Sequence, residues 1–191
     1  MNIYFVGGTS DFSSLIVKSL EEDYNHSVTA VGRRTGHSIP ENNKKIIHEA
    51  LEYDVVVNFS YSSGYQLDFT MDMYKEILEN QWNGYFINFG STIVLHGKSS
   101  MDRVLPPWQS IRYHSKKKSI QEAGHYISRR FYDNKFRYTQ IQCGMLANKK
   151  MQQLENYRDT CLQATDLSNM IHYLINTPRN WHIHEFMVDG L

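Results

Sequence analysis

The chain has 191 residues, of which 41% are hydrophobic, an ordinary share for a globular protein. A chain of this length buries a core that needs no disulfide or metal for stability, so we expect a single domain over residues 1–191. Twenty basic side chains balance twenty acidic ones, and the resulting net charge of zero argues against a dedicated nucleic-acid binder.

The two cysteines, Cys143 and Cys161, have neither zinc nor redox spacing, which favours a reduced, cytoplasmic protein. The first residues lack a basic region ahead of their apolar stretch. No segment is apolar over the roughly 18 residues that a membrane span needs. We therefore expect neither secretion nor insertion into a membrane.

Six apolar runs have the length of β-strands, at residues 3–6, 28–31, 55–59, 85–89, 138–142 and 185–188. Runs such as DVVVNF and YFINF are apolar at consecutive positions, as in strands covered on both faces. Helical patterns lie between them, at 12–22, 43–52, 69–80, 113 to about 132, and 166–175. This alternation predicts an α/β fold of three layers, with a doubly wound, mostly parallel sheet of six or seven strands. Ligands of such sheets bind at the carboxyl edge.

The segment GGTSDFSS joins the first expected strand to the first helix. Gly7 and Gly8 would let backbone amides and a helix N-terminus approach a pyrophosphate. Asp11 and Ser13 stand where a dinucleotide fingerprint has its later glycines. The alternative is a purely structural turn, in which Asp11 caps the helix by accepting the amide of Ser13 or Ser14.

The second strand ends in VTAVGRR, which places Arg33 and Arg34 where an NAD site carries a ribose-binding carboxylate. A guanidinium matches a phosphate group through two hydrogen bonds, so this pair favours the 2′-phosphate of NADP. The alternative is two solvated arginines on a loop. Little apolar sequence follows before the next helix, so we expect the third strand of a doubly wound sheet to be reduced.

Hydroxyl, phenol and amine groups follow in an order that suits acid–base chemistry. The strand YFINF leads into GSTIVLHG, so Ser91 or Thr92 would present a hydroxyl at the carboxyl edge. Tyr113 and Lys117 are four residues apart and share one face of a helix. A neighbouring ammonium stabilises a phenolate and lowers its pKa from about 10, which makes proton transfer to or from an alcohol feasible. The alternative is a solvated, basic first turn in RYHSKKK.

Taken in order, these motifs resemble the short-chain dehydrogenase/reductase family over almost the whole chain. GGTSDFSS resembles the family's TGxxxGxG, keeping Gly7 but placing Asp11 and Ser13 at the other glycines. DVVVNFS resembles DVLVNNAG, and FINFGST with YHSKK resembles the catalytic serine strand and the YxxxK helix. QCGMLAN resembles the PGxxxT turn with Cys143 in place of proline and Gly144 kept. EFMVDGL resembles the closing strand that ends in VDGG.

The resemblance implies a Rossmann-like, NAD(P)-binding oxidoreductase that transfers a hydride between NADP(H), preferred over NAD(H), and a small carbonyl or alcohol. Tyr113 would donate or accept the proton, Lys117 would hold the nicotinamide ribose and lower the tyrosine pKa, and Ser91 would bind the substrate oxygen. The cofactor-binding residues implied are Gly7, Gly8, Thr9, Ser10, Asp11, Phe12, Arg33, Arg34, Asn58, Phe59, Ser60, Tyr113, Lys117, Cys143 and Gly144.

The sequence also departs from the family. Asn58 and Ser91 are separated by room for only one helix and one strand, so a helix is shortened, and Asn80 is the nearest candidate for the family's fourth catalytic residue. An inserted loop precedes Tyr113, and its segment 106–108 (PPW) would cover the substrate or contact a partner. Asp11, Ser13 and the shortened helix motivate the alternative of a catalytically degenerate nucleotide-binding regulatory or interaction protein. A third possibility is a structural or interaction protein without nucleotide.

The remaining signals are weaker. His182 and His184 alternate as two metal ligands could, but the sequence offers no third ligand, so we expect no metal. A cysteine nucleophile would need an electropositive setting with a paired histidine. The expected partners are a small-molecule substrate and a second copy of the chain in a homodimer or higher homo-oligomer, with no nucleic acid and no membrane.

Overall fold

The computed structural model describes residues 1–61, 64–96, 106–130, 135–148 and 161–189. Within these ranges, six parallel strands form one sheet in the order β2-β1-β3-β4-β5-β6. The strands are β1 (Asn2–Val6), β2 (Ser27–Val31), β3 (Val55–Asn58), β4 (Tyr85–Phe89), β5 (Arg137–Cys143) and β6 (Glu185–Val188). All six predicted strands are therefore confirmed, and the sheet has the smaller of the two expected sizes.

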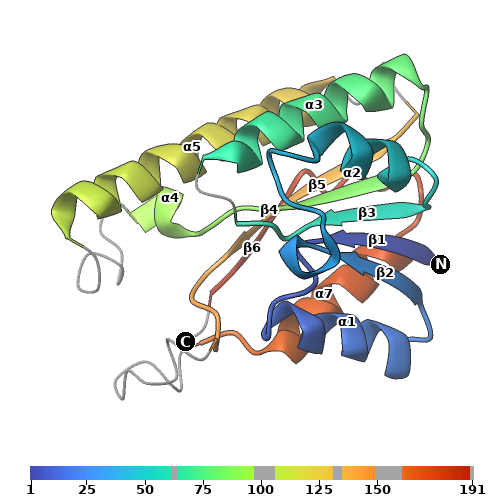
Figure 1. Ribbon diagram of the computed structural model, residues 1–191, viewed down its shortest axis with the longest axis horizontal. Coiled ribbons are helices and arrows are strands. Elements are labelled where there is room, and N and C mark those ends of the chain that lie inside the picture. Colours follow the sequence, from blue (N-terminus) through green and yellow to red (C-terminus); the bar gives the residue numbers. More distant parts are fainter. Residues whose placement is uncertain (62–63, 97–105, 131–134, 149–160, 190–191) are drawn as a thin grey trace.

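Helices cover both faces of this sheet (Figure 1), which confirms the three-layer, doubly wound architecture. The helices α1 and α7 pack on one face, and α2, α3 and α5 pack on the other. Their bounds are α1 (Ser13–Glu22), α2 (Asn43–Ala50), α3 (Tyr65–Glu79), α4 (Ile93–His96), α5 (Pro107–Arg129) and α7 (Ala164–Asn176), with a 3-10 helix η1 (Arg33–Thr35). Across the described ranges, no helix is both long enough and apolar enough to span a membrane.

The two layers of helices explain the continuous apolar runs in the central strands. Every residue of β3 and of β4 is buried. Successive side chains of a strand point to opposite faces. Phe5 and Ile87 accordingly join the core beneath α1 and α7, whereas Tyr4 and Phe86 join the core beneath α2, α3 and α5. A strand between two such cores must be apolar on both faces.

The order of the strands places the ligand crevice. From β1 the chain crosses to β2 on one side, and it then returns to β3 on the other side of β1. The carboxyl ends of β1 and β3 therefore flank the switch point, where ligands of doubly wound sheets bind. Among the described residues β2 is the outer strand on this side, which confirms the expected reduction of the third strand.

Two helices begin earlier than the sequence pattern predicts. α3 begins at Tyr65, and α5 begins at Pro107 with Pro106 as its N-cap. Proline fits the first helical position because an amide there has no helical acceptor. Trp108 therefore belongs to the first turn of α5 and is exposed, which corrects the expectation of a loop at this position. The first part of the expected inserted loop, residues 99–105, and the predicted helix end at 131–132 lie outside the described residues.

Polar contacts supplement the core between α1 and α7. The hydroxyls of Ser19 and Ser168 lie 2.8 Å apart. His26 follows α1, and its Nε2 lies 3.1 Å from Nδ1 of His172 on α7. Burial is the main cause that lowers the pKa of His26, and the N-terminal amine and His172 act in the same direction.

We predict that protonation of His26 destabilises the fold. Because its pKa lies below the ordinary value of 6.5 in the folded chain, the folded state binds fewer protons, and stability is lost as the pH falls below 6.5. The free energy of unfolding in urea should therefore decrease from pH 7 to pH 5.5. His26→Gln should flatten this slope, whereas His48→Gln, at an exposed position of α2, should preserve it; an unchanged slope in His26→Gln would contradict the assignment.

Candidate active site

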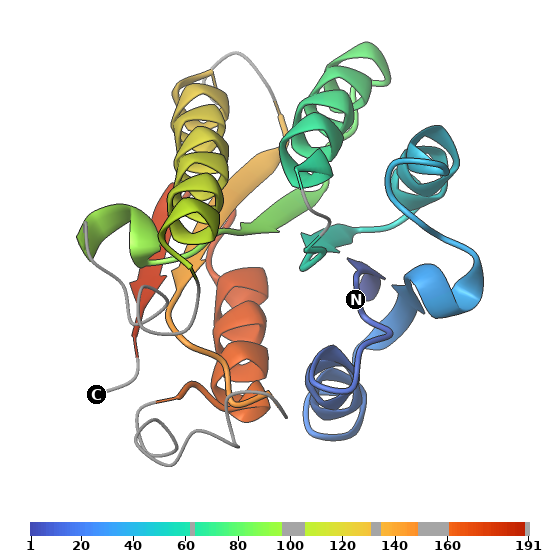
Figure 2. The same ribbon diagram turned by 60° about the vertical axis from the view of Figure 1, so that its left-hand side comes forward.

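Ser91, Tyr113 and Lys117 meet at the carboxyl edge of the sheet. Ser91 lies two residues after the end of β4, and the other two residues lie one turn apart on α5. The Ser91 hydroxyl lies close enough to the Tyr113 phenol to lower its pKa, and the Lys117 Nζ lies 5.8 Å from the centroid of the Tyr113 ring. The helix α5, which carries Tyr113 and Lys117, runs beside α3 and packs on β5, the strand next to β4 (Figure 2). A hydroxyl, a phenol and an ammonium thus face one small volume.

Burial controls the charges of this cluster. It raises the pKa of Tyr113 to about 12, although the hydrogen bond from Ser91 acts in the opposite direction. Burial also lowers the pKa of Lys117 to about 8. The phenol pKa is therefore raised rather than lowered, which corrects the expectation drawn from the neighbouring ammonium. At neutral pH both groups are protonated.

A chain of amide and carboxylate groups holds Ser91 from behind. The Ser91 amide donates to Oε1 of Gln142 at 2.7 Å, and Nε2 of Gln142 donates to Glu185 at 2.9 Å. Gln121 of α5 donates to the same carboxylate oxygen at 3.0 Å. Gly90 makes room for this arrangement, since a Cβ there would lie 2.0 Å from Oε1 of Gln142. Sequence analysis missed Gln142 and Glu185, for which the available signals were a glutamine within the strand RYTQIQC and a glutamate at the start of the strand EFMV.

Asn58 is buried at the end of β3 and has partners on both sides of its amide. Nδ2 donates to Oδ1 of Asn88 at 2.9 Å. Oδ1 accepts the hydroxyl of Ser60 at 2.6 Å and the amide of Ser60 at 3.2 Å. Asn58 therefore fixes the loop that borders the crevice, with Phe59 and Ser60 carried on it.

The first turn keeps its glycine geometry although two glycines of the fingerprint are replaced. Gly7 has φ +86°, and its amide donates to the carbonyl of Val31 at 2.8 Å. Ser13 is fully buried, and its hydroxyl donates to the Gly7 carbonyl at 2.7 Å. The Ser13 amide donates to Oγ of Ser10 at 3.2 Å. The serine thus braces the turn from inside.

Asp11 makes its charged contact with another loop. Its carboxylate pairs with Arg34 at 3.0 Å, across the ends of β1 and β2. The expected alternative of an Asp11 cap is not what the structure shows, because Phe12 is the N-cap of α1 and Ser10 accepts the amides of Ser13 and Ser14. Arg33, next to Arg34, is exposed on η1.

Several other predicted cofactor residues act through their backbone or their packing. Phe12 is buried and its ring stacks on that of Phe59 at 6.3 Å, while Gly8 packs its backbone against Ala30. The hydroxyl of Thr9 sits against Gly32, where a Cβ would lie 2.3 Å from it. These contacts bring the loops after β1, β2 and β3 together at one edge.

The turn after β5 closes the site on the opposite side. Gly144 donates its amide to the carbonyl of Val188 at 2.9 Å, and a Cβ on it would overlap Asp189. Burial raises the pKa of the Cys143 thiol to about 11, and burial also raises the pKa of Cys161. Both thiols therefore stay neutral at physiological pH, which gives no support to a cysteine nucleophile.

Asn80 does not join the cluster. It is the C-cap of α3, and its side chain donates to the Glu76 carbonyl at 2.9 Å. The beginning of α3 reaches the cluster instead, where Gln66 accepts a hydrogen bond from Lys117 at 2.9 Å. Within the described ranges, no group of three or more His, Cys, Asp or Glu side chains is arranged to hold a metal ion.

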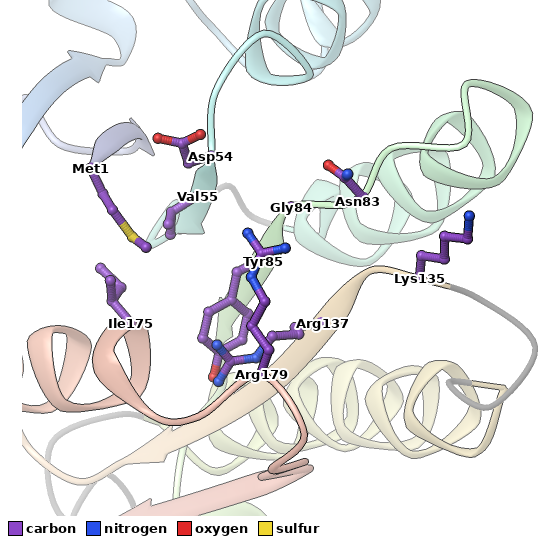
Figure 3. A pocket seen from close by; sticks show the side chains of 10 residues that line it. All are labelled: Met1, Asp54, Val55, Asn83, Gly84, Tyr85, Lys135, Arg137, Ile175 and Arg179. Atoms are coloured by element: carbon purple, nitrogen blue, oxygen red, sulfur yellow. The ribbon is translucent and has the colours of Figure 1, made fainter.

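A separate pocket lies at the other edge of the sheet, at the amino ends of β1, β3, β4 and β5 (Figure 3). Its wall includes Arg137, whose guanidinium donates to the carbonyls of Leu174 and Thr177 at the end of α7. The same group lies 4.1 Å from the centroid of the Tyr85 ring. This pocket therefore lies at the opposite edge of the sheet from Ser91, Tyr113 and Lys117. The hydrogen bonds of Arg137 stabilise the end of α7.

Comparison with known proteins finds the fold but no close relative. No protein-family model matches the chain, and no curated protein matches it. Its structure is similar to serine dehydrogenase from Escherichia coli, with 15% identity, a TM-score of 0.63, and 100% of this chain and 98% of that chain covered. It is also similar to 3-alpha-hydroxysteroid dehydrogenase from Pseudomonas sp. B-0831 complexed with NADH, with 13% identity, a TM-score of 0.68, and 100% and 95% covered.

A third similar structure is a short chain dehydrogenase from Leptospira borgpetersenii serovar Hardjo-bovis with bound NAD+. It is 16% identical, with a TM-score of 0.64, and the match covers 99% of this chain and 91% of that chain. At such identities the likeness establishes the fold. The chain has the Rossmann-like fold of the short-chain dehydrogenase structures that it matches, as the resemblance in its motifs implies.

We predict that Gly7→Ala destabilises the protein by about 2–3 kcal/mol, from the positive φ and from overlap with the backbone of Ser60. An alanine Cβ would lie 2.8 Å from the Ser60 Cα and N atoms. Gly36 is a matched control, because it also has a positive φ, +73°, but no described atom lies within 4 Å of its Cβ position. Gly36→Ala should cost only about 1 kcal/mol. Equal losses in urea unfolding would show that the close approach to Ser60 is unimportant.

Proposed function

We propose that this protein is an oxidoreductase of the short-chain dehydrogenase/reductase type, which transfers a hydride between NADP(H) and a small carbonyl or alcohol. The observation that carries this proposal is that the side chains of Ser91, Tyr113 and Lys117 lie together at the carboxyl edge, with Lys117 one turn further along the same helix as Tyr113. On this fold, that edge is where a dinucleotide binds, and two of the matched structures hold NADH or NAD+.

The residues around the crevice fit a dinucleotide. Gly7 keeps the positive φ that the turn after β1 requires, and the loop amides there lie at the start of α1. Arg33 and Arg34 would supply guanidinium groups for a 2′-phosphate. Asn58, Phe59 and Ser60 would border the adenosine half. We therefore assign the cofactor-binding role to the loops after β1, β2 and β3 and to the turn at Cys143 and Gly144.

Ser91, Tyr113 and Lys117 each have a different role in the proposed reaction. The bound cofactor would supply or accept the hydride. In the direction of reduction, the Ser91 hydroxyl binds the substrate oxygen and the protonated Tyr113 donates a proton to it. Lys117 is protonated below its pKa of about 8 and stabilises the phenolate that remains. The raised pKa of Tyr113 keeps the phenol protonated before the reaction, which suits a proton donor.

A second candidate function is supported by the ion pair of Asp11 and Arg34. Asp11 brings a negative charge to the turn where a pyrophosphate would bind, and it occupies one of the two arginines. These features suit a protein that retains the fold and binds nucleotide weakly, as a regulatory or interaction protein without turnover. For the enzyme, we also propose a single domain over the whole chain, a cytoplasmic location and assembly into a homo-oligomer.

Tyr113→Phe is the direct test of catalysis. It removes the proton donor but leaves the ring, so the rate of NADPH-dependent reduction across a panel of small carbonyl compounds should fall at least about 100-fold, with NADPH still bound. Tyr126→Phe is the matched control, because Tyr126 is an exposed tyrosine of the same helix. An unchanged rate in Tyr113→Phe would exclude the proposed proton transfer.

Titration with NADPH and NADH tests the cofactor. The wild-type protein should bind NADPH at least about tenfold more tightly than NADH, and Arg33→Gln or Arg34→Gln should reduce this ratio. Asp11→Asn should raise it about threefold, since Arg34 loses the carboxylate that competes with the 2′-phosphate. Arg179→Gln, at the opposite edge of the sheet, should not change it. Failure of the wild type to bind either nucleotide would contradict the proposed function.

A further inference from the structure

The Lys117 ammonium has three side chains around it, Tyr61 before α3, Gln66 in the first turn of α3 and Tyr113 one turn earlier on α5. Only 6% of Lys117 is exposed, and its Nζ donates to Oε1 of Gln66 at 2.9 Å. The ammonium lies 5.4 Å from the ring centroid of Tyr61 and 5.8 Å from that of Tyr113. The two rings supply cation–π attraction, which is strongest where water is excluded. Gln66 supplies the oxygen that accepts a hydrogen bond from the ammonium.

The orientation of the Gln66 amide is set by its other end. Gln66 is 3% exposed in the first turn of α3, and its Nε2 donates to the carbonyl of Phe89 at 2.6 Å. A carbonyl can only accept, so the NH₂ group must face Phe89 and the oxygen must face Lys117. The amide therefore connects the end of β4, just before Ser91, to the lysine on α5. Its two hydrogen bonds fix the lysine relative to the strand that carries the serine.

We propose that Gln66 is a positioning residue that holds the Lys117 ammonium in place beside Tyr113. This inference rests on the proposed function, since it gives Gln66 a part in the same site. A neutral acceptor suits this task because it binds the ammonium without cancelling its charge, which remains available to a Tyr113 phenolate. A carboxylate at the same place would form an ion pair and weaken that field.

The test follows the titration of Lys117 itself and needs neither substrate nor nucleotide. In protein labelled with 13C at the lysine Cε, the Lys117 resonance, identified by its loss in Lys117→Met, should titrate near pH 8. Gln66→Met removes the acceptor and should lower this midpoint. Gln121→Met is the matched control, because it removes another buried side-chain amide, on α5 itself, that bonds to Lys118 and Glu185 instead. It should leave the Lys117 midpoint unchanged.

A second variant moves the midpoint in the opposite direction. Gln66→Glu keeps the acceptor and adds a negative charge, so the Lys117 midpoint should rise above that of the wild type. If Gln66→Met does not fold, this rise decides the question. In the unmodified protein, the side-chain amide resonances of Gln66 should also shift with the Lys117 midpoint, a readout that requires no variant at Gln66. Two results would overturn the pairing of Gln66 with Lys117. One is a Lys117 midpoint that is the same in the wild type and in the folded Gln66 variants, and the other is a set of Gln66 resonances that do not change over the pH range in which Lys117 titrates.

The two proposals fail in different ways. A wild-type protein that binds no NADPH would contradict the proposed function while leaving the titration of Lys117 and its dependence on Gln66 as they are. If the wild-type protein binds NADPH but the Lys117 midpoint is the same in the Gln66 variants, only the positioning role is contradicted. In an active enzyme, Gln66→Met should also move the upper limit of the pH–rate profile to lower pH, which loss of stability by itself would not do.

Discussion

The contact between the side chains of Ser91 and Tyr113 joins the segment after β4 to α5, and the proposed chemistry depends on this contact. It forms because α5 lies along α3 and over β5, so that its Tyr113 face reaches the edge of the sheet. Gln142, held by Glu185, supports the serine from the side of β5 and β6. Gln66 supports the lysine from α3. Residues far apart in the chain therefore position each member of the cluster.

Removal from water affects the phenol and the ammonium in opposite directions but with the same result. It raises the pKa of Tyr113 and lowers that of Lys117, and in both cases the neutral form gains. Because the Lys117 pKa stays near 8, the site still holds a proton on both groups at neutral pH. This is the protonation state that the proposed proton donation to a substrate oxygen requires. Amide partners such as Gln66 keep the charged group bonded where water does not reach it.

The glycine turn shows how a degraded motif can keep its backbone path. Ser13 replaces a glycine, yet its buried hydroxyl bonds to the Gly7 carbonyl and so braces the loop. Asp11 replaces another, and its carboxylate pairs with Arg34 on the neighbouring loop. The shape of the turn is thus retained, and the change falls on its charge. The proposed nucleotide affinity and selectivity would depend on that charge.

The amino-acid sequence by itself determined the parallel sheet, the strand positions and the order in which Ser91, Tyr113 and Lys117 occur, because apolar periodicity and helical spacing are local properties of the chain. It did not determine the roles of Gln66, Gln142 and Glu185, since each makes its hydrogen bond to a residue more than 20 positions away. It also misled on Asn80, which the length of α3 carries to the opposite edge. The direction of the Tyr113 pKa shift was decided by tertiary structure alone, because burial depends on which helices and strands pack around the phenol.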